Sequence, residues 1–157
     1  MSELFQNYQN IIWRIESITP TYSRAGLKPF FFRIDDDEDP TQSGYDRAFK
    51  VAIIGGSSEM GVTDMHERQT DFSFAVEIYY NHSPLRNYMY EMISNDQRNI
   101  VWALENGDNW IGYSDSNSTD DISLISRSIE SISITEEDGG VWVLRLMGTS
   151  KIYETRN

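Results

Sequence analysis

The chain has 157 residues, with 13 lysines and arginines against 25 aspartates and glutamates, for a net charge of −12. Because the basic residues are scattered, no window supplies the clustered charge with which proteins grip nucleic acid through its phosphates. Cysteine is absent, which excludes disulfides, a thiol nucleophile and cysteine-bound metal and is compatible with a reducing compartment.

The length suits one domain, which we expect to span residues 1–157. No apolar run approaches the ~20 residues of a membrane span. The N-terminus shows neither the basic region nor the apolar core of a secretory peptide, so no contact with a membrane is expected.

The N-terminal third predicts one helix and a long connection. Apolar residues at helical spacing indicate a helix over 2–19, which Pro20 ends. The connection over 20–47 contains the apolar burst Phe30-Phe31-Phe32-Arg33-Ile34 and then the acidic run 35–39. A connection this long inside a compact domain is often functional or ordered only by a partner.

The middle of the chain predicts two strands and a long helix. Alternation of apolar and polar residues indicates strands at 48–54 and 71–80. The polar loop 55–70 between them is expected to project as an extended hairpin arm. The helix that follows has an N-cap, a first-turn proline and a C-terminal stop at Ser83, Pro84 and Gly107.

The C-terminal part predicts two more strands. Residues 108–121 are polar and turn-rich, and the isoleucine spacing after them indicates a short helix or an irregular lead-in to Arg127. A strand over 128–136 and a final strand over 141–153 then flank a hairpin turn, Glu137-Asp138-Gly139-Gly140.

The predicted order is therefore α-β-β-α-β-β. The fold class that accommodates these amphipathic elements is α+β (mixed α/β). We expect a four-stranded, mostly antiparallel sheet with the two main helices packed on one face.

Three consecutive phenylalanines stand out within the long connection. Phe30, Phe31 and Phe32 would point alternately to both faces of a strand, so at least one would be exposed on a monomer. Two readings stay open, a buried strand covered on both sides and a subunit interface. Met60 and Met65, in the predicted arm, are candidate adaptable contacts to a neighbouring subunit or partner.

The acidic run approaches a calcium-binding loop without matching it. Asp35, Asp37 and Asp39 take positions 1, 3 and 5, and Asp46 takes position 12. The motif needs glycine at position 6, where this chain has Pro40. A solvated acidic loop is the favoured interpretation.

No residue is predicted to be catalytic, to bind a cofactor or to ligate a metal, and we do not expect an enzyme. The histidines, His66 and His82, have no second histidine at ligand spacing. The run Gly55-Gly56-Ser57-Ser58 follows a strand but lacks the lysine and the spacing of a phosphate-binding loop.

Four segments resemble the tail terminator proteins of long-tailed (siphovirus-like) bacteriophages. They are the run Arg47–Val51, the strand Asp71–Tyr80, the helical run Asp96–Leu104 and the closing strand Val141–Leu146 with its continuation to Tyr153. The resemblance covers roughly two thirds of the chain, from Arg47 to Tyr153, and rests on spacing and length rather than on a catalytic signature.

The resemblance implies a structural virion protein that assembles as a homo-oligomer, most simply a hexameric ring. Such a ring caps the tail tube, ends its polymerisation and offers a joining surface to the head-side connector protein. The genome passes through the channel without sequence-specific binding, and an acidic channel would suit that passage. The expected location is the head-proximal end of the tail, after assembly in the host cytoplasm.

Two alternatives remain at the level of sequence. One is another ring component of a phage neck or tail, such as a connector or tube subunit. The other is a soluble acidic domain that binds a metal ion.

Overall fold

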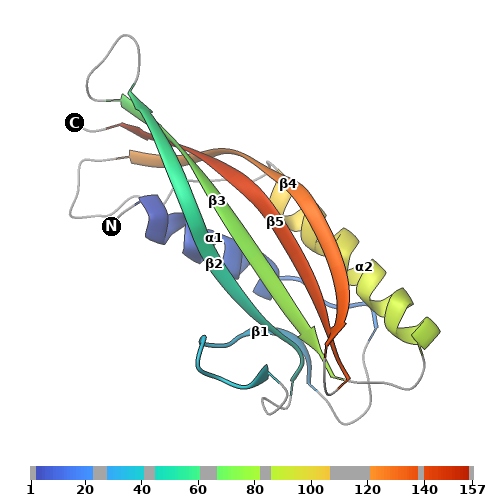
Figure 1. The fold of residues 1–157 in the computed structure, drawn as a ribbon. Helices are drawn as coiled ribbons and strands as arrows, with labels where there is room; N and C mark the ends of the chain where they lie inside the picture. Colours follow the sequence, from blue (N-terminus) through green and yellow to red (C-terminus); the bar gives the residue numbers. More distant parts are fainter. Residues whose placement is uncertain are drawn as a thin grey trace.

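The structure, a computed structural model, describes residues 3–22, 28–40, 45–60, 67–81, 86–106, 121–137 and 140–155. Its elements are two helices and five strands (Figure 1), in the order α1 (Glu3–Glu16), β1 (Lys28–Arg33), β2 (Tyr45–Met60), β3 (Glu67–Tyr80), α2 (Arg86–Glu105), β4 (Asp121–Glu137) and β5 (Val141–Thr155). The mixed α+β class predicted from the sequence is confirmed.

The sheet has five strands in the order β1-β2-β3-β5-β4, so the predicted four-stranded sheet is wrong. The additional strand is β1, which contains Phe30, Phe31 and Phe32 and pairs in parallel with β2. All other neighbouring strands pair antiparallel. The connection predicted over 20–47 thus contributes an edge strand to the sheet.

The predicted arm is largely strand. β2 continues to Met60 and β3 begins at Glu67, and the two stay paired out to Met60 opposite Arg68. Strand β5 accompanies β3 along this extension, from Ser73 opposite Thr149 to Glu67 opposite Thr155. The segment between Gly55 and Thr70 is therefore an extension of the sheet rather than a long loop, and only residues 61–66 lie outside the described part.

The core lies between the sheet and both helices, which cover one face of it (Figure 1). The alternation of strand β3 explains why the core lies on this face, because its even-numbered residues from Phe74 to Tyr80 are all buried on the helix side. Helix α1 contributes Ile11 and Ile15, and α2 contributes methionines, isoleucines and a leucine at helical spacing.

The short helix or irregular lead-in predicted before Arg127 is instead the first part of strand β4. This strand is continuous over Asp121–Glu137, and its register shifts twice, between Leu124 and Ser126 and between Ile129 and Ser131. Each shift adds a residue that has no partner on β5, which breaks the alternation expected of a regular strand.

The predicted hairpin turn after β4 is confirmed at its described end. Gly140 has a φ of 78°, which favours glycine, and its N–H donates to the carbonyl oxygen of Glu137 at 3.1 Å. Among the described helices, none is both long and apolar enough to cross a membrane.

Candidate assembly surfaces

The phenylalanine burst is divided between the core and the surface by the alternation of β1. Phe31 is 3% exposed and packs in the core, whereas Phe30 is 62% exposed and Phe32 is 40% exposed. Phe32 lies opposite Ala48 and Phe31 opposite Arg47, so Phe32 points to the sheet face that carries no helix. The register shifts between Lys28 and Phe31, and Phe30 lies within that irregularity.

Phe31 is buried within the subunit, whereas the interpretation of the segment as a subunit interface stays a prediction. Its ring lies 5.6 Å from the Arg47 guanidinium carbon and forms part of the subunit core. Phe30 and Phe32 both keep exposed surface on this edge strand, and we call this pair the phenylalanine edge. Nothing in the described part of the chain covers them fully, in contrast to the phenylalanines of β2 and β3.

A second exposed aromatic pair lies on the helix layer. Trp13 of α1 is 59% exposed and Trp102 of α2 is 72% exposed. The two helices meet here, because Arg14 donates from Nη1 to the carbonyl oxygen of Ala103 at 3.0 Å. We call Trp13 and Trp102 the tryptophan face; the sequence analysis did not single them out, although both stand opposite the apolar stripes of their helices.

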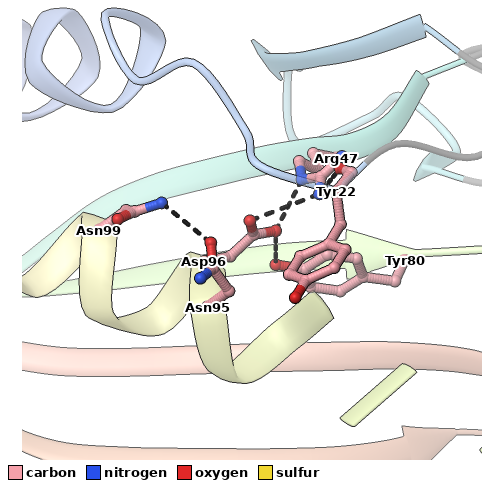
Figure 2. Close-up of polar contacts among 6 residues, drawn as sticks. All are labelled: Tyr22, Arg47, Tyr80, Asn95, Asp96 and Asn99. Carbon is pink, nitrogen blue, oxygen red and sulfur yellow. Dashed lines mark hydrogen bonds and ion pairs between the residues drawn. The ribbon is translucent and has the colours of Figure 1, made fainter. Parts of the chain in front are cut away.

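A buried polar network joins α2 to the sheet (Figure 2). Arg47 of β2 donates from Nε to Asp96 Oδ2 at 2.6 Å, and Tyr80 donates its hydroxyl to the same oxygen at 2.7 Å. Arg47 also donates from Nη2 to Asp96 Oδ1 at 3.4 Å and to the backbone carbonyl of Tyr22. The network thus connects the segment after α1, strands β2 and β3, and helix α2.

The network is shielded from solvent, since Arg47, Tyr80 and Asp96 are all 0% exposed. Burial raises the pKa of the Asp96 carboxyl group, and the hydrogen bonds from Arg47 and Tyr80 oppose that rise. Burial, with Asp96 beside it, raises the pKa of Tyr80 well above its ordinary value, so the phenol stays protonated and donates. The network ties α2 to strands β2 and β3 through Arg47 and Tyr80.

The sequence analysis did not recognise this network. Its signal is present, because Asp96 interrupts an apolar stripe of α2 that otherwise consists of residues such as Met92, Ile93 and Ile100. A charged residue at an apolar position predicts a buried partner. The identity of that partner, 49 positions earlier in the chain, has no local signal.

The structure describes few of the other residues that the sequence analysis named. Met60 ends β2. Met65, His66 and His82 lie outside the described residues, as does most of the turn-rich segment before β4. The proposal that the methionines contact a partner stays a prediction.

The four candidate calcium ligands differ in burial. Asp35, Asp37 and Asp39 are exposed after β1, while Asp46 is fully buried within β2. Asp35 instead pairs with Arg33 at 2.9 Å, and the Asp36 carbonyl accepts a hydrogen bond from Lys50. Across the described ranges, no group of three or more histidine, aspartate or glutamate side chains is placed to hold a metal ion.

Comparison with known proteins assigns the chain to no family. No protein-family model matches the chain, and no curated protein matches it either.

Proposed function

We propose that this protein is a structural subunit of a bacteriophage tail, which forms a ring that caps the tail tube and joins it to the head. The observation that carries the proposal is the phenylalanine edge, where Phe30 and Phe32 both expose large apolar side chains on an edge strand. Exposed apolar patches of this kind mark surfaces that other proteins cover.

The position of the exposed aromatics supports a ring rather than a two-fold dimer. Within the phenylalanine edge, Phe32 points to the helix-free face of the sheet, whereas the tryptophan face lies on the helix layer. A closed ring is built from repeated contacts between two different surfaces of the same subunit, which this separation provides. The tail tube and the head-side connector are the partners that the resemblance implies.

The buried network suits a subunit that must keep one arrangement of its helices and sheet within an assembly. Asp96 couples helix α2 to Arg47 and Tyr80 in the centre of the sheet. Satisfied buried polar groups favour one arrangement of the elements over its competitors. The acidic composition, net −12, would let a genome pass the ring without adhering to it.

The test is assembly with and without the phenylalanine edge. The variant Phe30→Asp/Phe32→Asp should keep the melting temperature of the wild type and lose the ring, measured by native mass spectrometry and by electron microscopy of assembled tails. Interface anchors of this type contribute about 2 kcal/mol or more, so the dissociation constant between subunits should rise by at least roughly 30-fold.

The matched control is Ser94→Asp, which adds a charge at an exposed position of α2 and should leave assembly unchanged. Because free subunits could stay monomeric until a tube end templates them, the decisive image is the head end of assembled tails. Wild-type tails without a ring of this subunit at that end would refute the proposal.

A further inference from the structure

A buried arginine with neutral partners lies between α1 and the far edge of the sheet. Arg127 of β4 is 4% exposed. It donates from Nε to Ser150 Oγ at 2.9 Å, from Nη1 to Asn10 Oδ1 at 3.0 Å and from Nη2 to Asn7 Oδ1 at 2.9 Å. These acceptors are all neutral, and no carboxylate of the described chain bonds this guanidinium group.

A second guanidinium group adds positive charge to the same place. Arg14 of α1 is buried and donates from Nε to Asn10 Oδ1 at 3.2 Å, so one amide oxygen serves both arginines. Burial, and secondarily the charge of Arg14, lowers the pKa of Arg127 to about 9. A group with this pKa is still protonated at neutral pH, so the fold carries a buried positive charge whose desolvation opposes folding.

The third observation is a buried donor without an acceptor. Asn7 is 2% exposed, and its Nδ2 finds no hydrogen-bond acceptor among the described residues. Buried amide donors almost always have a partner, and an exception calls for an explanation such as an ion or a water. Next to Arg127, the group that would accept from Nδ2 and also offset the charge is an anion.

We propose that Asn7 and Arg127 form a buried site for a small anion between α1, β4 and β5, beside Asn10 and Arg14. Inorganic phosphate, chloride and a carboxylate share the chemistry that the site recognises, which is an acceptor carrying negative charge. The bound anion accepts from Asn7 Nδ2 and from the second N–H of Arg127 Nη1 and Nη2, and it thereby ties α1 to the sheet. The site stands independently of the proposed tail function.

The experiment is a thermal melt of the full chain in zwitterionic buffer with millimolar sodium phosphate, sodium chloride or sodium formate added one at a time. At an anion concentration ten times the dissociation constant, the wild-type melting temperature should rise by about 3–6 °C and saturate. Arg127→Met should lose the response, whereas Arg86→Met, which removes an exposed arginine, should keep it.

Asn7→Asp keeps the test decisive if Arg127→Met does not fold. This variant supplies a carboxylate within hydrogen-bond reach of Arg127, so it should melt higher than the wild type without added anion and respond to none of the three salts. A wild type that responds to no anion overturns the proposal whatever the variants do. An equal response in Arg127→Met, or a lower melting temperature for Asn7→Asp, overturns it as well.

Discussion

Replacing Asp96 by alanine should be among the most damaging single changes in this chain. The substitution removes the carboxylate that accepts from Arg47 Nε at 2.6 Å and from the Tyr80 hydroxyl at 2.7 Å. It leaves the Arg47 guanidinium group, which is 0% exposed, without its counter-charge. Removing one partner of a buried ion pair costs about 3–5 kcal/mol.

For a chain of this length, that cost corresponds to a fall of roughly 6–20 °C in melting temperature. Urea denaturation measures it directly, as a lower midpoint with an unchanged slope. The matched control is Glu136→Ala, which breaks the Arg86–Glu136 pair at 3.0 Å on the surface and should cost at most about 1 kcal/mol.

A double variant separates the charge from the packing. Arg47→Met/Asp96→Leu removes both charges and should recover much of the stability lost in Asp96→Ala, because well-packed apolar groups replace buried ion pairs at little cost. If Asp96→Ala costs no more than Glu136→Ala, the network does not hold α2 on the sheet. A double variant as unstable as Asp96→Ala would show that packing, rather than the unpaired charge, sets the loss.

Three further outcomes follow from the geometry. Because burial raises the folded pKa of Asp96, the pH-dependent part of its contribution to stability is complete at acid pH and is lost as the pH rises through the folded value, above the ordinary 3.8. The stability of the wild type relative to Asp96→Asn, from urea melts in a pH series, should therefore fall with rising pH, and a rise would contradict the shift. Gly148→Ala should cost about 1–3 kcal/mol, because its Cβ would meet Ser128 O at 2.3 Å, whereas Gly55→Ala, with nothing within 4 Å, should cost far less in the same melts. Phe31→Asp should unfold the subunit in a thermal melt, unlike the substitutions at Phe30 and Phe32, and a folded Phe31→Asp that fails to assemble would return that residue to the interface.

The strongest elements could be predicted from the sequence because their signals are local. The alternation of β3 and the helical spacing of α2 are both visible in a short window, and both elements lie where they are expected. The hairpin turn at Gly140 has the same origin, since its backbone requirement belongs to one residue. These signals were sufficient for the α+β class.

The part of strand β4 before Arg127 was mispredicted because the two register shifts disguise the alternation of the strand, whereas the predicted strand over 128–136 lies within β4. The residues of β4 that lie opposite the core side of β5 are separated alternately by two and by three positions, because one residue is added after Leu124 and another after Ile129. Such spacing resembles the apolar spacing of a helix. Strand β1 was missed for a different reason. It has six residues and its partner, β2, is parallel, so nothing adjacent in the chain predicts the pairing.

The polar sites depend wholly on the tertiary structure. Arg47 meets Asp96 across 49 positions, and Arg127 meets Asn7 across 120. The sequence alone determined where the two helices and the central parts of β2, β3 and β5 lie, because backbone propensity and apolar period act over a few residues. Which charges are buried, and against what, was decided only when the sheet brought distant segments together, because desolvation and hydrogen bonding depend on neighbours in space.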